Sequence, residues 1–472
     1  MPGRRLTLTR VLASAGVLAL TPHRALCASE IVVRNVTGLY PVAVSRVVVP
    51  RSSPEVCEAV RGWPGKVAIG GGRYSMGGQV AIAGGLHLDM RAMKRVLWIA
   101  VDQRRARVQA GITWRDLQDA LDPLDLSVKT MQSYANFTVG GAVSVNAHGR
   151  YVGNGPVGNT VLALRLVLAD GRLVDASRQQ HAELFRAAIG GYGAIGVITE
   201  VELELADNVR MERTVVEVPL EGYLEHFDRA VLGDDSSILH NADLMPPRFD
   251  LPVSVTWRAT DRAATVPDRL VARGKRYALE KSVMWAMTEL PRGDRLRKSL
   301  IHPLLAAQPA VEWRNHEASL DVAELEPRSR RTSTYALQEY FIPRRRFLSF
   351  ARALPAALAR NKVRAVNVSL RHSPADTLAV LPWAKEEVIS FVLYYKQGTA
   401  PAERARIERW TRKLIDLALD HEGRYYLPYQ LHATREQFHR AYPESELLRQ
   451  VKAEVDPTGR FSNEMWAKYL LG

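Results

Sequence analysis

Three clusters of glycine and other small residues are the clearest chemical feature of the sequence. They lie at 69–79, 137–149 and 190–201, and each contains a pair or triplet of adjacent glycines. Because glycine has no Cβ, such loops can present consecutive backbone N–H groups to an anion such as a pyrophosphate. One loop of this kind is as often a structural turn, but three together indicate a long ligand that lies close to the main chain.

The spacing inside the first cluster argues against two common nucleotide-binding loops. Residues 70–75 have the sequence Gly-Gly-Gly-Arg-Tyr-Ser, which is not the GxGxxG pattern of a Rossmann NAD site. The cluster also lacks the Gly-Lys-Ser/Thr of a Walker loop. We therefore predict a different dinucleotide-binding arrangement, and we expect no metal site.

Strand and turn signals surround the clusters over residues 66–205. The segment 197–205 alternates apolar and charged residues with a period of two, as a half-buried strand does. Asp170-Gly171 is typical of a hairpin turn, and Thr113 suits the N-cap of a helix over 114–121. We predict strands at 31–33, 47–49, 66–69, 86–90, 106–110, 162–169 and 197–205, and a second helix at 183–189.

The composition changes in the second half of the chain. Residues 208–320 lose the glycine clusters, whereas strand and helix patterns alternate again over 333–395. The predicted elements of this half are strands at 335–342, 363–370 and 388–395, a helix from 344 and a helix at 402–419. A glycine-rich ligand-binding domain followed by a second domain is therefore expected.

The three clusters, in this order and spacing, resemble the FAD-binding domain of the vanillyl-alcohol oxidase and p-cresol methylhydroxylase (PCMH-type) flavoproteins. The segments 338–343 and 455–463 resemble parts of aldonolactone and alditol oxidases, and decaprenylphosphoryl-ribose oxidases are a second similar subgroup. The resemblance implies an α+β fold, in which a PCMH-type FAD-binding domain of two α/β subdomains carries an inserted mixed-sheet cap domain. It implies an FAD-dependent oxidoreductase that transfers hydride from a CH–OH donor, a polyol, sugar or sugar lactone, to flavin N5.

The resemblance also divides the chain and assigns cofactor contacts. We expect an FAD-binding domain at 38–207, a substrate-binding or cap domain at 208–410, and a C-terminal segment, 411–472, that returns to the flavin site. The first cluster corresponds to the pyrophosphate loop, the second runs along the flavin and the third closes the adenine end. The residues expected to bind FAD are Gly70, Gly71, Gly72, Arg73, Tyr74, Ser75, Gln79, Thr138, Gly140, Gly141, Ser144, Asn146, His148, Gly149, Gly193, Gly196, Val197, Ile198 and Asn463.

One departure from the family concerns how the flavin is attached. Many relatives carry Gly-His-Ser at the first cluster, and that histidine bonds covalently to the flavin. Alignment on Ser75 puts Tyr74 in its place, with Arg73 before it. Neither side chain forms a histidyl link, so we predict non-covalent FAD. Cys57 lies upstream of the loop and is expected to be buried packing rather than a tether.

The candidates for catalysis lie mainly in the predicted second domain. The strand around 366–372 alternates, so that Asn367, Ser369 and Arg371 share one face. In the similar oxidases an arginine at the end of such a strand contacts substrate or flavin, and we carry that role over to Arg371; a surface salt bridge is the alternative. Glu339 and the weaker candidate Tyr340 lie on the matching strand.

Further candidates come from a neighbouring strand and from the second cluster. Tyr394 and Lys396 could face the same pocket by the period of two, although a solvated lysine is the plainer alternative. His148 lies in the flavin segment and is a candidate for a catalytic role, with packing as the alternative.

A second departure concerns the run 424–432, which resembles the lysine-bearing strand of the relatives near flavin N1. Gln430 stands where that lysine would be. An amide can hydrogen-bond the reduced ring but cannot neutralise its charge, so the task would pass to Lys396 or Arg371.

The N-terminus and the composition bear on where the protein acts. The chain has 472 residues, of which 47% are hydrophobic, and two cysteines, so a disulfide framework is excluded. Residues 1–28 combine basic residues, a short apolar run and small residues, which predicts a signal peptide, and Arg4-Arg5 permits a twin-arginine signal. We expect an exported protein, either periplasmic or membrane-associated.

Part of the net charge of +14 is concentrated in one stretch of the second domain. Residues 262–314 hold eleven Lys and Arg against five acidic residues, which gives +6, with Met284, Trp285 and Trp313 interleaved. This stretch would allow peripheral contact with an anionic membrane, and a lipid-linked sugar is then the alternative substrate. A non-catalytic flavin-binding protein is another alternative. No nucleic-acid-binding motif accompanies the charge, so we expect no nucleic-acid partner.

Overall fold

The computed structural model describes residues 31–275, 310–324, 327 and 329–470. The predicted signal peptide and most of the basic stretch lie outside these residues. The strands are β1 (Ile31–Val33), β2 (Val42–Val44), β3 (Arg46–Val48), β4 (Val67–Gly70), β5 (Leu86–Asp89), β6 (Val96–Ala100), β7 (Arg105–Gln109), β8 (Leu126–Val128), β9 (Val161–Val167), β10 (Leu173–Ser177), β11 (Val197–Asp207), β12 (Arg210–Glu217), β13 (Ser237–Leu244), β14 (Val253–Ala259), β15 (Val311–Trp313), β16 (Ser333–Pro343), β17 (Ala365–Ser373), β18 (Val388–Gly398) and β19 (Arg424–Tyr425). The α-helices are α1 (Ser53–Arg61), α2 (Trp114–Leu121), α3 (Val139–Ser144), α4 (Ala182–Ala188), α5 (Tyr223–Phe227), α9 (Arg314–Ala318), α10 (Phe347–Arg360), α11 (Pro401–Asp420), α12 (Arg435–Ala441), α13 (Ser445–Val455) and α14 (Glu464–Tyr469).

The first glycine cluster begins at the end of a small parallel sheet. Its strand order is β3-β5-β4, and β4 runs directly into the cluster. Helix α1 joins β3 to β4, and the side chain of its N-cap, Ser52, accepts a hydrogen bond from Glu55 N. The buried face of α1, which includes Val56 and Cys57, packs into the core beside this sheet. Cys57 is therefore buried packing, as predicted.

The other two clusters flank an antiparallel sheet with the order β10-β9-β11-β7-β6, and β8 also pairs with β11. The hairpin between β9 and β10 turns at Gly171, whose φ of +81° explains the glycine there. Thr113 caps α2 as predicted, because its side chain accepts a hydrogen bond from Asp116 N. The second cluster forms the short helix α3, and the third leads into β11. This half thus has the two subdomains expected of the α+β fold.

The second half of the chain is built on an eight-stranded sheet with the order β15-β12-β14-β13-β17-β18-β16-β19. Every neighbouring pair is antiparallel, so the expectation of a mixed sheet was wrong. The sheet is antiparallel throughout because of how the chain crosses over through α10. This helix joins β16 to β17, which run in the same direction, but β18 inserts between them and is antiparallel to both.

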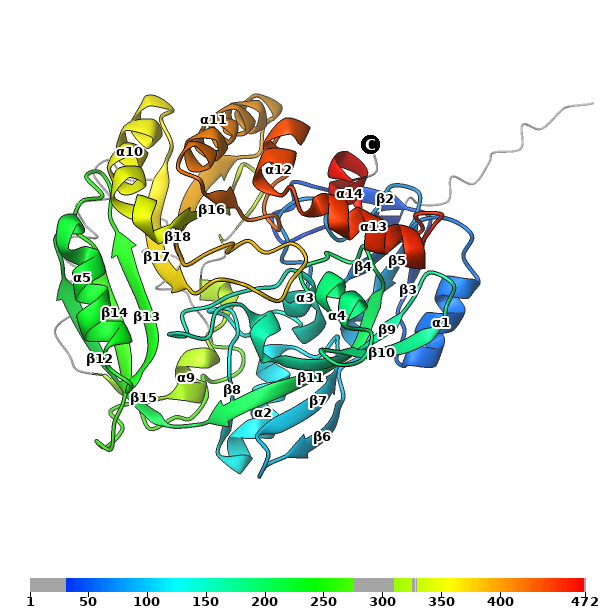
Figure 1. Ribbon diagram of the computed structural model, residues 1–472, viewed down its shortest axis with the longest axis horizontal. Coiled ribbons are helices and arrows are strands. Elements are labelled where there is room, and N and C mark those ends of the chain that lie inside the picture. The colour runs from blue at the N-terminus through cyan, green and yellow to red at the C-terminus, as the bar shows by residue number, and fades with distance from the viewer. Residues whose placement is uncertain (1–30, 276–309, 325–326, 328, 471–472) are drawn as a thin grey trace, which may run out of the picture. The chain divides into compact units, whose positions relative to one another are not determined.

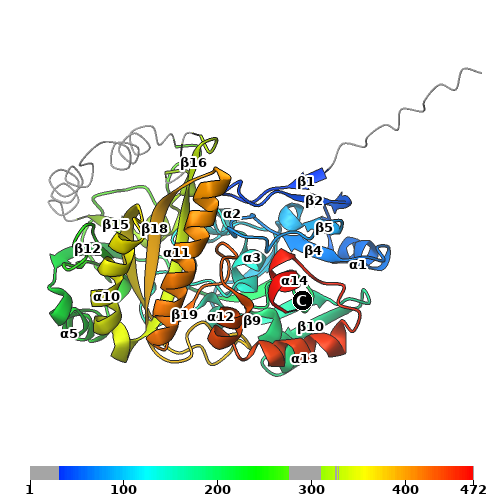
Figure 2. The same cartoon turned by 90° about the horizontal axis from the view of Figure 1, so that it is seen from above.

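Helices cover one face of the eight-stranded sheet and leave the other to the site. Figures 1 and 2 show α10 and α11 lying across β16, β17 and β18. Phe391, Leu393 and Tyr395 of β18 join Phe350 and Trp410 of these helices in the largest apolar core. Because side chains alternate along a strand, the residues between them face the opposite way. The expected domain limit at 410 falls inside α11.

Candidate active site

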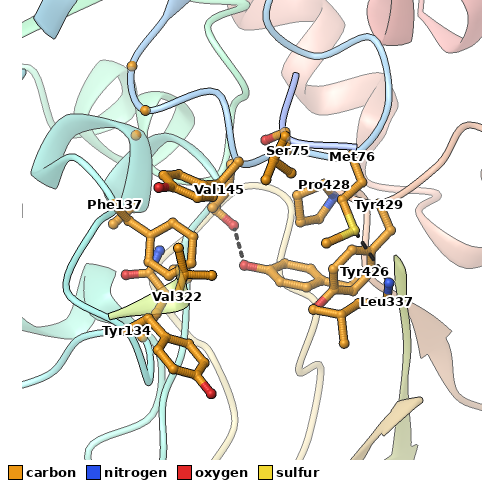
Figure 3. Close-up of a pocket in the computed structure, with 18 of the residues that line it drawn as sticks. Ser75, Met76, Tyr134, Phe137, Val145, Val322, Leu337, Tyr426, Pro428 and Tyr429 are labelled. Atoms are coloured by element: carbon orange, nitrogen blue, oxygen red, sulfur yellow. Dashed lines mark hydrogen bonds between the residues drawn. The ribbon is translucent and has the colours of Figure 1, made fainter. Parts of the chain in front are cut away.

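A cavity of about 890 Å³ lies between the three glycine clusters and the uncovered face of the eight-stranded sheet. Strands β13, β16, β17 and β18 line one side of it, together with the segment 426–429 that follows β19. In Figure 3, Phe137 lies on the glycine-rich side, while Leu337 and Tyr429 lie across the cavity from it. The cavity therefore joins parts of the chain that are far apart in sequence.

Most of the residues expected to bind FAD line this cavity. The expected residues that do not line the cavity are found just behind its wall, in contact with other protein groups. The lining residues are Gly71, Gly72, Arg73, Tyr74, Ser75, Gln79, Thr138, Gly140, Gly141, Ser144, His148, Gly193, Gly196 and Ile198. The expected residues outside the lining are Gly70, Asn146, Gly149, Val197 and Asn463.

The two asparagines outside the lining use their side chains to hold the wall in place. Asn146 Nδ2 donates to Asp376 Oδ2 at 2.8 Å, and Asn146 Oδ1 accepts from Gly158 N at 3.0 Å. Asn463 Oδ1 accepts from Trp466 N at 3.0 Å as the N-cap of α14, and its Nδ2 donates to Tyr192 O at 2.9 Å. These amides are satisfied within the protein, which differs from the expected contact with FAD.

The glycine-lined wall suits a ligand that approaches the main chain closely. A Cβ on Gly71 would lie 2.2 Å from Thr138 Oγ1, and one on Gly140 would lie 2.5 Å from Ala110 Cβ. Gly193 has a φ of +75°, in the left-handed region. No side chain fits at these points without movement of its neighbours, so the glycines allow the segments of this wall to pack closely together. The residues present therefore fit an extended dinucleotide such as FAD.

Arg73 brings a cation to the first cluster. Its backbone has a φ of +60°, unusual for a residue with a Cβ, and its Nη2 donates to Asp89 Oδ2 at 2.9 Å. Burial alone would raise the pKa of Asp89, but hydrogen bonds from Arg91 and the charge of Arg73 lower it. The Nε of Arg73 is buried and has no hydrogen-bond partner. The Asp89 carboxylate thus fixes a guanidinium with an unused donor at the cavity wall.

A buried imidazole–carboxylate pair joins the glycine-rich side of the cavity to the cap side. His148 Nε2 lies 2.7 Å from Glu339 Oε1, and both side chains are almost fully buried. Ser390 Oγ donates to the same Oε1 at 2.7 Å, and Tyr429 Oη donates to Oε2 at 3.1 Å. Burial by itself would raise the pKa of Glu339, but the neighbouring His148 and Arg371 lower it. The pair combines one predicted residue from each half of the chain.

The walls around His148 are aromatic. Its ring centroid lies 4.8 Å from that of Trp383, 5.6 Å from that of Phe341 and 5.8 Å from that of Tyr426. Such packing excludes water from three sides of the imidazole and fixes its orientation. In a neutral imidazole whose Nε2–H donates to Glu339, Nδ1 is the nitrogen that can accept a proton.

Arg371 lines the cavity, on the same face of the sheet as Glu339. Burial lowers the pKa of its guanidinium, although the negative charges of Glu339 and Asp243 oppose that shift. Its Nε is buried without a hydrogen-bond partner. The alternative of a surface salt bridge does not describe this residue, because Arg371 faces the cavity.

Three other expected candidates lie elsewhere. Tyr340 points to the opposite face of β16 from Glu339 and is buried in the helix-facing core. Lys396 is on the cavity-facing side of β18 by alternation but lies beyond the lining residues, and burial lowers its pKa. Gln430 faces away, since its Nε2 donates to Tyr395 Oη at 2.8 Å and to Gln397 Oε1 at 2.7 Å.

The segment after β19 supplies functional residues that the sequence patterns missed. Tyr429, the neighbour of Gln430, faces the cavity, and Tyr426 Oη donates to Val145 O at 2.9 Å (Figure 3). The resemblance of 424–432 to the lysine-bearing strand of the relatives located the right segment. It selected Gln430, whereas the side chain that faces the cavity is that of the preceding residue, Tyr429. Asp243 of β13 was missed altogether, because no motif surrounds it.

The described arginines of the basic stretch are engaged within the protein. Arg262 pairs with Glu212, Arg269 with Asp122 at 2.9 Å, and Arg273 with Asp116 at 2.6 Å. Residues 276–309 of this stretch lie outside the described residues. Among the residues described, no helix is long and apolar enough to cross a membrane.

Comparison with known proteins connects both halves of the chain to flavin enzymes. The family described as FAD binding domain matches residues 44–177, and the D-arabinono-1,4-lactone oxidase family matches residues 255–469.

Two of the relatives match over almost the whole chain, and a third matches over a shorter part of it. The L-gulonolactone oxidase of Mus musculus is 23% identical over 419 residues, which is 88% of this chain and 92% of the relative. The decaprenylphosphoryl-beta-D-ribose oxidase of Mycolicibacterium smegmatis is 24% identical over 463 residues, 89% of this chain and 93% of the relative. The cytokinin dehydrogenase 2 of Arabidopsis thaliana is 33% identical over 141 residues, which are 30% of this chain and 28% of that protein.

These matches agree with a cavity that has one wall of glycine-rich backbone and a buried imidazole–carboxylate pair that joins this wall to the cap side. The cofactor is FAD, as the flavin-domain match and the lactone oxidase relatives show. The chain thus joins a match to the FAD binding domain family with a match to the D-arabinono-1,4-lactone oxidase family, and it is an FAD-dependent oxidoreductase that acts on CH–OH groups.

Proposed function

We propose that the enzyme oxidises a hydroxyl group of a neutral polyol, sugar or sugar lactone, with His148 as the acceptor of the hydroxyl proton. The 2.7 Å contact between His148 Nε2 and Glu339 Oε1 carries this proposal. The carboxylate holds the proton on Nε2, directs Nδ1 toward the substrate and stabilises the imidazolium that forms. Arg371 then positions the substrate oxygen through its unused Nε–H.

FAD, when bound, supplies the hydride acceptor. The residues that would hold it are those of the three clusters that line the cavity, with the unpartnered Nε of Arg73 at the first cluster. Aromatic walls at Trp383, Phe341 and Tyr426 keep water from the proton acceptor. The remaining chemistry of the protein is then to orient one hydroxyl and remove its proton.

The test is anaerobic reduction of the flavin by a panel of alditols, sugars and aldonolactones, with the H148A and E339Q variants beside the wild type. General-base catalysis contributes about 10²–10⁴-fold, so H148A loaded with FAD should slow flavin reduction by that factor. The exposed His439 provides the matched control, H439Q, which should behave as wild type. A reduction rate for H148A close to that of wild type would remove His148 from this role.

We propose further that the FAD is bound non-covalently. Support comes from Tyr74, which lines the cavity in the place of the family's histidine and packs edge-on against Phe137 at 4.7 Å between ring centroids. Acid precipitation should leave the yellow flavin in the supernatant. A yellow pellet would overturn this assignment.

The chain division and cellular location are also proposals. We infer a flavin domain at 38–207, a cap at 208–410 and a returning segment at 411–472; the two family matches on either side of 207 support the first limit. We propose an exported protein, periplasmic or membrane-associated, without a nucleic-acid partner. Fractionation of cells that express the full chain tests the location.

A lipid-linked sugar at a membrane surface is the second candidate substrate. It is favoured by the similarity to decaprenylphosphoryl-beta-D-ribose oxidase along most of both chains. Arg262, Arg269 and Arg273 already pair with acidic residues of the protein. An attraction of the basic stretch to anionic lipid would therefore have to come from the basic residues in 276–309. Sedimentation with anionic and with neutral vesicles separates the candidates, because only the second predicts binding that depends on anionic lipid.

A further inference from the structure

One row of side chains crosses the cap wall of the cavity, from Glu339, the carboxylate that holds His148, to the far end of the wall. In the sheet register, Glu339 of β16 pairs with Val392 of β18, Val392 with Ser369 of β17, and Ser369 with Asp243 of β13. All four residues line the cavity. Three inter-strand spacings of about 4.8 Å separate the ends of this row, so the backbones of Glu339 and Asp243 lie about 14 Å apart across the sheet.

The far carboxylate is held in place but has an unused oxygen. Asp243 Oδ1 accepts a hydrogen bond from Asn367 Nδ2 at 3.2 Å. Asp243 is half-buried, and its Oδ2 makes no hydrogen bond to any other described residue. Asn367 itself lines the cavity one row away, beside Tyr394. A carboxylate fixed on one oxygen and open on the other is an acceptor for the O–H groups of a ligand.

The cations near this end have their own acidic neighbours. Arg150 Nη2 donates to Glu317 Oε1 at 2.6 Å, and its Nη1 lies 3.5 Å from Asn241 Oδ1. The negative charges of Glu339 and Asp243 both act on Arg371. This end of the cavity therefore offers a hydrogen-bond acceptor and no surplus positive charge, which favours hydroxyl groups over a carboxylate or phosphate.

The separation across the cap wall is of the same length scale as a six-carbon donor. An extended six-carbon chain is about 6 Å long between its end carbons, since each bond is about 1.5 Å. A C–O bond and a hydrogen bond of about 2.8 Å at each end extend this reach to about 14 Å. A three-carbon chain reaches about 4 Å less and cannot engage both ends of the row at once.

We propose that Asp243, oriented by Asn367, is a specificity-determining residue that accepts hydrogen bonds from the substrate hydroxyls farthest from the reacting carbon. The proposal rests on the assigned oxidation of a neutral polyhydroxyl donor at His148. It makes the enzyme selective for donors that are long enough to reach from His148 to Asp243.

The experiment compares wild type, D243A and D243N on linear alditols of three to six carbons, from glycerol to sorbitol. Two readouts are used: kcat/KM, and the change in flavin absorbance on titration, which also detects bound ligands that do not react. We expect the kcat/KM of D243A to fall about tenfold on the six-carbon alditol and less than twofold on glycerol. The loss in kcat/KM should increase with chain length. Asp250, which pairs with exposed Arg248 outside the cavity, provides the control variant D250N, which should lose nothing.

Two failures can be told apart. In the first case the wild-type flavin is reduced by a neutral donor, but the Asp243 variants lose the same factor in kcat/KM on alditols of every chain length, or lose none. The role of Asp243 is then overturned and the proposed function stands. If no neutral alditol, sugar or lactone reduces the wild-type flavin, the proposed function itself fails. Should D243A not fold, D243N retains the side-chain shape, and a loss of less than threefold on the six-carbon alditol would count against the proposal.

Discussion

The two walls of the cavity differ in what they offer a ligand. The glycine wall presents backbone and small side chains, as at Gly71 and Gly140, where a Cβ would collide with neighbours. The cap wall presents ionisable and aromatic side chains, such as Glu339, Arg371 and Tyr429, at intervals set by strand register. The first wall is sensitive to added atoms, whereas the second is sensitive to lost functional groups.

This difference separates two properties that an enzyme of this kind needs. A backbone wall can bind the same cofactor whatever substrate is used, because its contacts come from N–H groups that every residue has. A side-chain wall can change its substrate with a few substitutions. Variants that disturb one wall should therefore leave the function of the other largely intact, and the following predictions test that separation.

The largest effect is expected from a lysine behind the glycine wall. Lys452 Nζ donates to Asp456 Oδ2 at 2.6 Å and to the backbone oxygens of Ala194 and Phe461, and it is buried. K452M leaves Asp456 buried without its cation, which costs about 3–5 kcal/mol of unfolding free energy. Denaturant unfolding of the holoenzyme measures this loss, and FAD affinity should fall with it.

The same helix offers a matched control for that prediction. Arg449 and Glu446 of α13 form an exposed pair at 2.6 Å. R449M should cost about 0–1 kcal/mol, because exposed pairs gain little in water. Equal losses for K452M and R449M would mean that the third cluster is not held by Lys452, and that the glycine wall does not depend on side chains behind it.

Adding one methyl group to the glycine wall is the next test. In G140A the new Cβ would lie 2.5 Å from Ala110 Cβ and 2.9 Å from Ala110 O, so the wall must shift. We expect a loss of about 1–3 kcal/mol in unfolding free energy and weaker FAD binding, measured by denaturation and by flavin titration. The double variant G140A/A110G should recover part of both.

Gly222 provides the comparison for Gly140. It lies in the cap region, a Cβ there meets nothing within 4 Å, and its φ is −92°. G222A should leave FAD affinity unchanged. If G140A also leaves it unchanged, close approach of the backbone is not what binds the cofactor.

The difference between the walls also explains what the sequence could predict. Gly70 to Ser75 and the strand Val197–Asp207 are local patterns, and the elements were predicted from them, while the family resemblance placed most of the expected FAD contacts on the cavity wall. The approach of His148 to Glu339 depends on how two halves of the chain pack, which no local pattern contains. The period of two gave the face of Arg371, but Gln430 was misplaced because a shift of one residue reverses the face of a side chain.

A pH-dependent loss of stability should affect both walls alike. Burial, with the charge of Arg73 in support, lowers the pKa of His87 to about 4, and burial lowers that of His240 to about 3. Below pH 6.5 these two histidines bind protons in the unfolded chain but stay neutral in the folded protein. The free energy of unfolding therefore falls as the pH falls. Each should cost about 2 kcal/mol between pH 6.5 and 5, since one pKa unit is about 1.36 kcal/mol.

Unfolding by denaturant at pH 6.5 and at pH 5 measures that loss for each histidine. H87Q on the glycine side and H240Q on the cap side should each reduce the difference between the two pH values by a similar amount. An unchanged difference in H87Q would show that its imidazole is protonated in the folded state, and would make the two sides unequal.

The smallest effects come from two tyrosines that lie close together, with ring centroids 5.7 Å apart, and serve opposite walls. Tyr429 Oη donates to Glu339 Oε2 at 3.1 Å, whereas Tyr426 Oη donates to Val145 O at 2.9 Å. One hydrogen bond is worth about 1 kcal/mol, so each phenylalanine variant should change its own function about fivefold. Y429F should slow flavin reduction at unchanged FAD affinity, because it loosens the carboxylate that holds His148. Y426F should weaken FAD binding, since it frees the backbone of the second cluster, and it should slow reduction less than Y429F does. If both variants alter the same quantity, the two walls do not act separately.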